Sequence, residues 1–278
     1  PTQQHHRNVI DFRQMSADEA RQWPDLWKLL EQRVKPERDL VKRDSLRKRW
    51  WQHADPRPGL YKALGNLDRV IVNSSVGDKL SFAFQPTDRV FSHALNVFLF
   101  DSNAAFALLQ SRVHEVWARA LGSSMKDDLR YTPSSCFETF PFPTDWARMA
   151  QLESVGLEYF AFRADLMVRD NQGLTKTYSR FNDPTETSSR IVELRRLHDA
   201  MDRAVLDAYG WGDIRPNCEY LLDFEDPSDV DDLAKASKKK RPWRYRWPDE
   251  VRDEVLARLL ALNAERSRVS GLAKEPKR

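Results

Sequence analysis

Residues 129–143 read LRYTPSSCFETFPFP, and the pattern of the chain changes at this stretch. The prolines at positions 141 and 143 fix their backbone φ and favour an extended link. Phe140 and Phe142 alternate with them, and aromatic side chains of this size contribute strongly to packing. We therefore expect a structural stretch whose phenylalanines hold together two parts of different secondary structure.

The sequence before residue 143 mixes strand patterns with a long helical pattern. Buried strands are predicted at Arg69–Asn73 and Val97–Phe100, because each is a short apolar run. A half-buried strand is predicted at Leu80–Phe84, where large apolar residues alternate with small ones. From Asn103 to Ala120 the apolar residues recur at helical spacing, and Gly122 is a natural helix terminator.

The N-terminal stretch predicts a short strand and two helices. Asn8–Phe12 alternates weakly and is typical of a short strand. Ser16–Glu19 is a capping box, with serine at the cap and glutamate three residues later, so a helix should open there. That helix should end near Trp23–Pro24. A second helix is expected over Asp25–Val34, interrupted by Lys35–Arg38.

Helical spacing dominates after residue 143. Helices are expected over Leu152–Val168, Ser188–Tyr209 and Pro248–Ser267, with turn signals between them. The sequence therefore predicts an α+β fold, in which a mixed α/β domain at residues 1–143 is followed by a mainly α-helical domain at residues 144–278.

The composition is that of a globular protein, since 41% of the 278 residues are hydrophobic and 31% are charged. Apolar runs such as Phe98–Phe100 are far too short to cross a bilayer, and no signal peptide is visible, so we expect a cytoplasmic protein without a membrane partner. The chain starts at Pro1 rather than methionine, which suggests a fragment or processed form. Cys136 and Cys218 form no CxxC pair, so we expect reduced thiols.

Catalytic motifs are absent from the sequence: there is no glycine-rich phosphate loop, no HExxH and no GxSxG. Asn182–Pro184 lacks the second proline and the aromatic residue of the Asn-Pro-Pro-Tyr loop of amino-methyltransferases, and is interpreted as a helix-entry turn. His114 and His198 are lone helical histidines, which are more often surface or core residues than catalysts. The pair Asp127–Asp128 is interpreted as electrostatic. We therefore expect no catalytic residue, no metal and no cofactor in this chain.

Basic residues beside aromatic residues give the first positive signal. The net charge of +3 says little, because local asymmetry matters more for nucleic-acid binding than the sum. A basic cluster, defined as Arg43, Arg47, Lys48 and Arg49, directly precedes Trp50 and Trp51. The cluster would neutralise phosphates while the indoles anchor the segment. An equally weighted alternative is a solvated amphipathic helix whose tryptophans enter the core.

Two further segments carry the same signal. In the loop 123–132, short hydroxyl donors accompany Lys126 and Arg130, which suits phosphate contact and the reading of base edges. Arginine pairs with guanine, and Asp128 would accept from cytosine. Lys238–Trp247 is cationic and aromatic, but the acidic run Asp223–Asp232 precedes it. For that segment DNA binding and pairing within the chain carry equal weight.

Residues 129–143 resemble the segment that closes the target-recognition domain in large single-chain restriction–modification proteins of the MmeI-like (type IIL) class. The PglX methyltransferases of BREX systems and the DISARM methyltransferases are similar. Two later segments agree in order, namely Leu174–Tyr178 with Phe181–Pro184, and Leu197–Trp211. The resemblance covers the second half of the chain strongly, and the first half by its position and by Val34–Arg38.

The resemblance implies a protein whose upstream part is an S-adenosylmethionine-dependent methyltransferase acting on adenine N6, sometimes preceded by a nuclease. The cofactor loop and the Asn-Pro-Pro-Tyr motif of that part are absent from this sequence. For this chain the resemblance therefore implies recognition of double-stranded DNA and scaffolding, with the methyltransferase domain or subunit as partner. In such families the recognition domain reads bases in the major groove while the methyltransferase holds the flipped adenine.

By this logic the loop Ser123–Ser135 is the first candidate for contacts in or near the groove. Lys126 and Arg130 would be the principal donors, and Asp128 a base acceptor. The complete set of predicted DNA-binding residues is Arg43, Arg47, Lys48, Arg49, Lys79, Ser124, Lys126, Asp128, Arg130, Tyr131 and Ser134.

A second hypothesis is a protein-interaction module that docks the methyltransferase to other defence-system subunits. The mainly α-helical domain, residues 144–278, is here called the helical part. It and its charged segment Asp223–Arg246 suit that role. Salt dependence separates the two hypotheses, because each phosphate contact adds about 0.9 to the log–log slope of DNA affinity against salt. A third reading, a free-standing nuclease or methyltransferase, is disfavoured by the absent motifs.

Overall fold

The structure is a computed structural model that describes residues 8–125, 128–222 and 243–272. These residues group into two compact units. The main unit comprises the described residues of 69–85 and 93–278, and the N-terminal unit comprises those of 4–68 and 86–92. Helices and small sheets both occur, so the predicted α+β fold is confirmed.

Short helices build the N-terminal unit. They are α1 (Ala17–Ala20), α2 (Pro24–Arg33), α3 (Lys35–Asp39), α4 (Asp44–Lys48) and α5 (Pro58–Leu64). The predicted capping box is confirmed, because Glu19 N donates to Ser16 Oγ (3.3 Å) and Ser16 N donates to Glu19 Oε2 (2.7 Å). Pro24 opens α2, since its fixed φ suits the first turn of a helix.

The predicted strand at Asn8–Phe12 is wrong, because these residues form neither strand nor helix. Phe12 is buried and packs against Trp23, with ring centroids 6.0 Å apart. Ile10 O lies 3.2 Å from His53 Nε2. This apolar stretch is therefore held by side-chain packing and a hydrogen bond, and it needs no partner strand.

Tryptophan rings form the core of the N-terminal unit. The ring of Trp27 lies 4.7 Å from that of Trp50 and 5.8 Å from that of Trp51, measured between centroids. Trp50 is buried, and Trp51 Nε1 donates to Met15 O (2.9 Å). The tryptophans beside the basic cluster therefore enter a core, which is the structural alternative that the sequence left open.

A three-stranded sheet in the main unit confirms the three predicted core strands. Its order is β3 (Phe82–Pro86), β1 (Arg69–Ser74), β4 (Leu95–Phe98). β1 and β4 are antiparallel, with Ile71 opposite Phe98. β3 and β4 are each displaced by two residues from the predicted ranges, because local alternation does not fix where a strand begins.

Two further sheets consist of very short strands. In one, β6 (Asp128–Arg130) lies between β2 (Val76–Gly77) and β5 (Ser123–Met125). In the other, β7 (Glu219–Leu222) pairs with β8 (Trp243–Arg246). Strands of two to four residues leave no readable period in a sequence, so the sequence patterns predict none of them.

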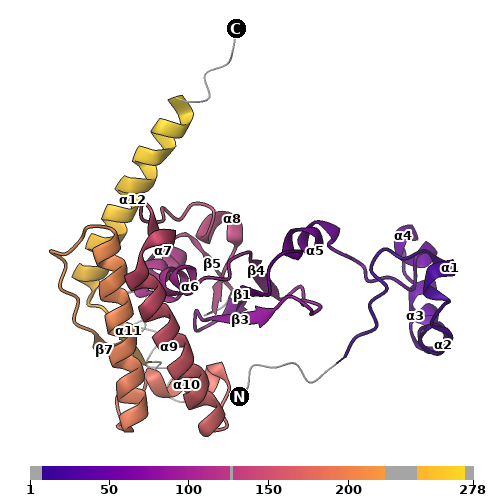
Figure 1. Ribbon diagram of the computed structural model, residues 1–278, viewed down its shortest axis with the longest axis horizontal. Helices are drawn as coiled ribbons and strands as arrows, with labels where there is room; N and C mark the ends of the chain where they lie inside the picture. Colours follow the sequence, from indigo (N-terminus) through magenta and orange to yellow (C-terminus); the bar gives the residue numbers. More distant parts are fainter. Residues whose placement is uncertain (1–7, 126–127, 223–242, 273–278) are drawn as a thin grey trace, which may run out of the picture. The chain divides into compact units, whose positions relative to one another are not determined.

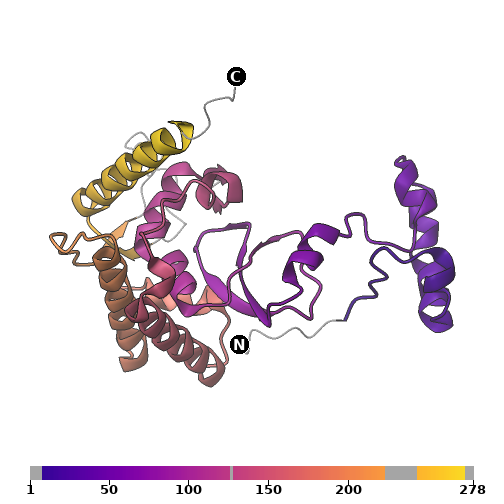
Figure 2. The ribbon, with the colours of Figure 1, turned by 45° about the horizontal axis from the view of Figure 1, so that its top comes forward.

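The three long helices predicted after residue 143 are confirmed as α9 (Ala150–Arg169), α11 (Ser189–Ala208) and α12 (Asp249–Leu272). The other helical segments of this unit are α6 (Asn103–Gln110), α7 (Arg112–Leu121), α8 (Pro133–Cys136), η1 (Trp146–Arg148) and α10 (Leu174–Phe181). α9 lies beside α6 and α11 (Figure 1), and α12 lies beside α7 (Figure 2). Within the described part of the chain, no helix is both long enough and apolar enough to cross a membrane.

The helix predicted over Asn103–Ala120 is divided at Ser111. Ser111 has extended backbone (φ −66°, ψ 156°), and its hydroxyl accepts from His114 N as the cap of α7. Arg112 N donates to Asp202 Oδ1 (2.8 Å), a residue on α11. A backbone N–H at the start of α7 is therefore hydrogen-bonded to a side chain ninety positions later in the sequence. The local spacing of apolar residues does not predict such a partner.

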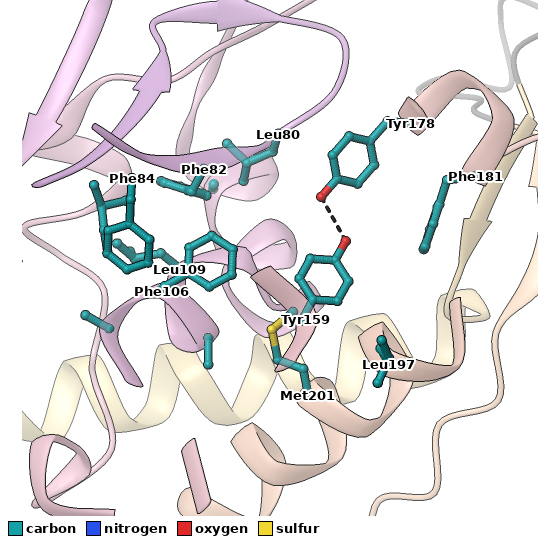
Figure 3. Packing of buried hydrophobic residues seen from close by; sticks show 14 of the residues in the cluster. Leu80, Phe82, Phe84, Phe106, Leu109, Tyr159, Tyr178, Phe181, Leu197 and Met201 are labelled. Atoms are coloured by element: carbon teal, nitrogen blue, oxygen red, sulfur yellow. Dashed lines mark hydrogen bonds between the residues drawn. The ribbon is translucent and has the colours of Figure 1, made fainter. Parts of the chain in front are cut away.

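The main core joins the sheet to the helices. Phe82 and Phe84 of β3 pack with Phe106 of α6, as Figure 3 shows, and Tyr159 and Tyr178 share a hydrogen bond of 2.9 Å between their hydroxyls. The cluster thus includes residues from both sides of position 143.

The link around residue 143 is structural, as predicted. Phe140 is buried, with its ring centroid 4.5 Å from that of His114 and 4.9 Å from that of Phe142. Phe142 in turn lies 5.5 Å from Trp146. The predicted division into a recognition domain at residues 1–143 and a helical domain at residues 144–278 stays a prediction. The two compact units of the structure have their boundaries elsewhere, at residues 68/69, 85/86 and 92/93.

The turn at Asn182–Pro184 differs from its prediction. It follows α10 rather than opening a helix, and Asn182 is the C-terminal cap of α10. Asn182 Nδ2 donates to Tyr178 O (2.8 Å), and its Oδ1 accepts from Tyr245 N (3.0 Å). This asparagine therefore connects α10 to β8.

Candidate nucleic-acid interface

The sheet β2-β6-β5 forms the centre of the candidate interface. Arg130 on β6 lies opposite Val76 of β2 on one side and Ser123 of β5 on the other, with both pairs antiparallel. Directly opposed residues share one face of a sheet, so these three residues form a row, here called the β6 row. Arg130 and Ser123 are exposed, and Val76 is half-buried.

Asp128 is on the same face as Arg130, because side chains alternate along a strand. It is half-buried, whereas the intervening Leu129 is buried. The candidate base acceptor and the candidate base donor are therefore neighbours on one face of β6.

Gly122 sets how closely the small sheet approaches α7. A Cβ at this position would lie 2.5 Å from Ala118 O and 2.6 Å from Leu129 Cδ1. Gly122 ends α7, as predicted, with extended backbone (φ −72°, ψ 158°). Its lack of a side chain, rather than a left-handed conformation, is therefore what this position requires.

A cavity of about 790 Å³ lies beside the small sheet in the main unit. Lys79, Asp128 and Leu129 line it on the side of the sheet. Other charged residues that line it are Arg112, Glu115, Arg119, Arg244, Arg246, Asp249, Arg252 and Asp253. The structure therefore brings Lys79 and Asp128, which the sequence singled out separately, to one cavity.

Carboxylates partly offset the cations of this cavity. Lys79 pairs with Asp78, and Arg119 Nε donates to Glu115 Oε1 (2.9 Å). Burial opposes ionisation of Glu115, but the positive charges of Arg119 and Arg244 outweigh it and lower the pKa of that carboxyl. The walls therefore differ from a purely cationic phosphate groove.

Asp249, which also lines the cavity, likewise offsets cations there. Its Oδ1 accepts from Arg246 Nη1 (2.6 Å) and from Arg252 Nη1 (2.8 Å), so one carboxylate serves two guanidiniums. The hydrogen bond with Arg246, helped by the positive charges of Arg246 and Arg252, lowers the pKa of Asp249 against the effect of burial.

Tyr131 is a core residue, which corrects its place among the DNA-binding candidates. It is 2% exposed, and its hydroxyl lies 2.9 Å from His114 Nε2. Burial raises the pKa of Tyr131 and lowers the pKa of His114 to about 3, so both side chains are neutral at physiological pH. Its burial leaves almost no side-chain surface for a DNA contact, and we omit Tyr131 from the interface.

The basic cluster lies in the N-terminal unit, and all four of its residues are exposed. Arg43 Nε donates to Ser45 Oγ (3.0 Å). Arg47 and Lys48 both pair with Asp44, whose pKa their hydrogen bonds lower. A single carboxylate thus faces two cations at the surface of α4.

The remaining candidates have less defined surroundings. Ser134 is exposed on α8. Ser124 lies on β5 opposite Leu129 in the strand register. Lys126, one of the two predicted principal donors, and Asp127 lie outside the described residues, as do residues 223–242.

Sequence reasoning missed Arg112, which is buried at the first position of α7. Its Nη1 donates to Asp202 Oδ2 (2.6 Å) and to Asp199 Oδ1 (2.9 Å), and lies 3.0 Å from His198 Nδ1. Its Nη2 donates to Tyr245 O (3.2 Å). The segment Leu197–Trp211, quoted above for its resemblance, thus supplies a clamp for Arg112, here called the Arg112 clamp.

Metal and thiol chemistry find no support in the described residues. No group of three or more histidine, cysteine, aspartate or glutamate side chains there is arranged to hold a metal ion. Cys136 and Cys218 are free thiols, and burial raises the pKa of both.

Comparison with known proteins places the chain in a family. Residues 2–144, more than half of the chain, match the family described as the target recognition domain of MmeI. The chain belongs to the MmeI target recognition domain family. The resemblance to the MmeI-like class inferred from residues 129–143 is thereby confirmed.

Among the relatives of this MmeI-family chain is DNA methyltransferase A of Bacillus subtilis (strain 168). It is 29% identical over 123 residues, which cover 44% of this chain and 13% of that protein. A solved structure of the type IIL restriction–modification enzyme MmeI in complex with DNA aligns with 90% of this chain and 29% of its own. That alignment has a TM-score of 0.49 at 16% identity. The chain therefore spans a minor part of the length of both proteins.

Proposed function

We propose that this chain is the sequence-recognition module of a site-specific DNA methyltransferase, with recognition in residues 1–143 and a helical scaffold in residues 144–278. The observation that carries the proposal is the β6 row: a chain of the MmeI target recognition family exposes Arg130 on the central strand of a small sheet. A two-stranded ribbon such as β5-β6 fits the major groove, where each base pair presents a distinct pattern of donors and acceptors.

The chemistry of the row suits base reading. Arg130 would donate two hydrogen bonds to guanine O6 and N7, the commonest specific contact of arginine with DNA. Asp128 would accept from cytosine N4, and the methyl groups of Val76 would meet the methyl group of thymine. The exposed basic cluster would bind phosphates without reading sequence.

The catalytic step belongs, in this proposal, to a separate methyltransferase domain or subunit that transfers a methyl group from S-adenosylmethionine to adenine N6. The residues of this chain do not fit that cofactor. A nucleotide-type turn needs clustered glycines, whereas Gly122 is the one glycine among the described residues that line the cavity. We place the complete protein in a restriction–modification system or in a phage-defence system of the BREX or DISARM kind.

Fluorescence-anisotropy titration with random-sequence duplex DNA, at low and at physiological salt, tests the proposal first. Salt-sensitive binding supports it, and selection from a random duplex library should then enrich a defined sequence. A chain that binds DNA equally at both salts, or that enriches no sequence, would contradict sequence recognition. Methyl transfer by the purified chain with S-adenosylmethionine would contradict the separation of recognition from catalysis.

The mixture of cations and carboxylates in the cavity walls favours a second role beside the first. Walls in which Asp249 serves two arginines, and Glu115 serves a third, suit a polar protein surface better than a row of phosphates. We propose that the walls carrying Glu115, Arg119 and Asp249, rather than the side of the small sheet, dock the methyltransferase to another defence-system subunit. Binding of such a partner through charged walls should fall with salt, because salt screens exposed charges. It should lack the counterion release that gives DNA binding its steep log–log slope.

A further inference from the structure

The helix α7 carries the β6 row at one of its ends. Gly122 follows α7 directly and leads into Ser123, the residue of β5 that lies opposite Arg130. The close approach of Gly122 to Leu129 fixes β6 on the same end. Any change in the direction of α7 therefore moves the row.

The same helix also holds the chain next to β2. Arg119 Nη2 donates to Asp78 O (3.1 Å), which follows Val76 and Gly77 of β2 by one residue. Arg119 is kept in place by Glu115, one turn earlier on α7. Two of the three strands of the small sheet are thus tied directly to α7, and β6 pairs with both.

The opposite end of α7 is fixed by the Arg112 clamp. The guanidinium of Arg112 is 4% exposed and is held by Asp199 and Asp202 of α11 and by the carbonyl of Tyr245 of β8. Burial opposes ionisation of Asp202, but His198 and Arg112 outweigh it and keep the pKa of this carboxyl below its ordinary value. The clamp therefore joins α7 to the helical part through the buried pair Arg112–Asp202 and the half-exposed Asp199.

Because α7 joins the Arg112 clamp at one end to the β6 row at the other, a small tilt of this helix displaces the row. A helix of ten residues is about 15 Å long, so a tilt of about 4° at one end moves the other by about 1 Å. Recognition by two parallel hydrogen bonds tolerates displacements of about 0.5 Å. Loss of one clamp contact would thus displace Arg130 from the base that it reads, while the small sheet stays folded.

We infer that Arg112 is a positioning residue for base recognition, through which the helical part fixes the orientation of the β6 row. The inference rests on the proposed function of the row and extends it to residues beyond the family match at 2–144. The helical part then acts on sequence preference rather than on binding to phosphates.

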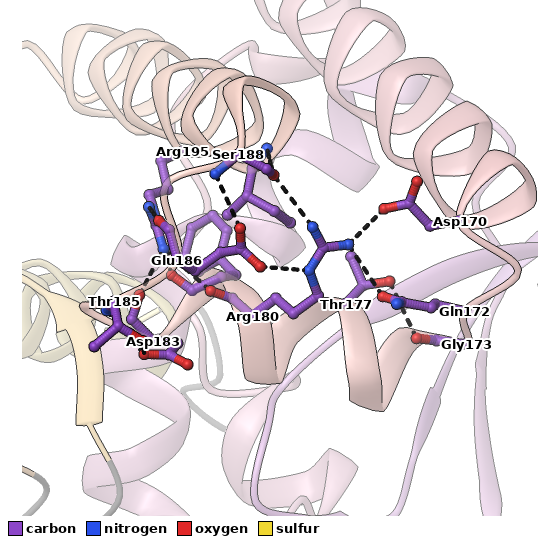
Figure 4. Close-up of polar contacts among 12 residues, drawn as sticks. Asp170, Gln172, Gly173, Thr177, Arg180, Asp183, Thr185, Glu186, Ser188 and Arg195 are labelled. Carbon is purple, nitrogen blue, oxygen red and sulfur yellow. Dashed lines mark hydrogen bonds and ion pairs between the residues drawn. The ribbon is translucent and has the colours of Figure 1, made fainter.

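Conservative variants test the inference in the full chain. Arg112→Lys keeps the charge but loses the fork, and Asp199→Asn removes one charge from a half-exposed member of the clamp, for use should Arg112→Lys fail to fold. The matched control is Arg180→Lys. Arg180 also holds several partners, among them Glu186 (2.6 Å) and Ser188 (3.2 Å), but all lie within the helical part (Figure 4).

The readout is the ratio of affinities for the sequence selected by the wild-type chain and for random duplex, with stability measured by urea unfolding. Arg112→Lys or Asp199→Asn should lower this ratio at least fivefold and leave affinity for random duplex within twofold. Arg180→Lys should leave the ratio unchanged even where it lowers stability. A clamp variant that folds and keeps the wild-type ratio overturns the inference.

The failure of the proposed function looks different. A wild-type chain that selects no sequence refutes sequence recognition itself, and the inference falls with it. A wild-type chain that selects a sequence, with clamp variants that select it equally well, refutes the inference alone.

Discussion

Arg130 and Arg112 are the same residue type in two environments. Arg130 is exposed on β6 with Val76 and Ser123 beside it, whereas Arg112 is buried among carboxylates. Arg130 was predicted from the sequence because arginine is the usual reader of guanine and because its segment resembles that of the MmeI-like class, and its role stays a proposal. Residue type alone cannot separate an exposed arginine from a buried one. It was not enough for Arg112 or Tyr131, because the burial of each depends on partners, Asp202 and His114, that are distant in sequence.

Replacing Arg130 by alanine should change sequence preference rather than general affinity. Loss of a bidentate base contact should cost about 1–3 kcal/mol at one base pair and relax selection there. Selection from a random duplex library, compared between Arg130→Ala and the wild-type chain, measures this. Identical selected sequences from both proteins would show that Arg130 reads no base.

His114 should make stability depend on pH. Burial lowers its pKa in the folded chain to about 3, against about 6.5 in an unfolded chain. Between these values the unfolded chain binds a proton that the folded chain does not, so the free energy of unfolding falls as pH falls below about 6.5. The contribution lost between pH 8 and pH 5 is about 2 kcal/mol.

Urea unfolding of the wild-type chain and of His114→Gln, at a series of pH values, isolates this contribution. The other titrating groups are common to both proteins, so the difference between the two curves reports on His114. The wild-type chain should lose about 2 kcal/mol more than the variant between pH 8 and pH 5. Parallel curves would mean that His114 is protonated or exposed in the folded chain.

At the scale of elements, local patterns predicted what packs locally. The apolar run at β1 and the spacing of α9 and α11 were sufficient to predict a strand and two helices. The strand predicted at Asn8–Phe12 is absent because a strand needs a partner, which no local pattern supplies. The three strands of the small sheet escaped prediction because each has only two or three residues. β2 is also paired with a strand that lies far from it in the sequence, since Val76 is opposite Arg130.

The contact between α6 and α9 requires a glycine, and a substitution should expose that requirement. A Cβ on Gly156 would lie 2.1 Å from Asn103 O and 3.2 Å from Ala107 Cβ, so the two helices would have to separate. Gly156→Ala should therefore destabilise the chain by about 3 kcal/mol, as overpacking in a rigid core does. Gly173→Ala is the control, because a Cβ there would meet nothing within 4 Å.

Thermal or urea unfolding compares the two variants directly. Gly173→Ala should lose only about 1 kcal/mol, because Gly173 is the N-cap of α10, where alanine is less favourable than glycine. Equal stabilities of both variants would show that α6 and α9 are packed less closely than the structure indicates.

At the scale of the whole molecule, the residues proposed for DNA contact are distributed over both compact units. The β6 row belongs to the main unit and the basic cluster to the N-terminal unit. The two sets differ in chemistry, since the row would read bases and the cluster would bind phosphates. The sequence predicted the cluster and, in the row, Arg130, and both predictions stay proposals. Val76 joins the row only through strand pairing, and only the fold shows that Trp50 behind the cluster is buried in a core and cannot stack on bases.

Salt dependence distinguishes the contribution of the cluster from that of the row. Arg49 is exposed at the end of α4, and Arg49→Ala should weaken binding to every duplex and reduce the log–log slope against salt by about 0.9, the value for one phosphate contact. Lys28→Ala is the control, because Lys28 is an exposed cation of the same unit that lies outside the cluster. Anisotropy titrations of both variants between low and physiological salt measure the slopes.

A smaller slope for Arg49→Ala alone places a phosphate at the cluster. Equal reductions in both variants would mean that the unit attracts DNA by its overall charge, so that the cluster makes no contact of its own and recognition depends on the β6 row.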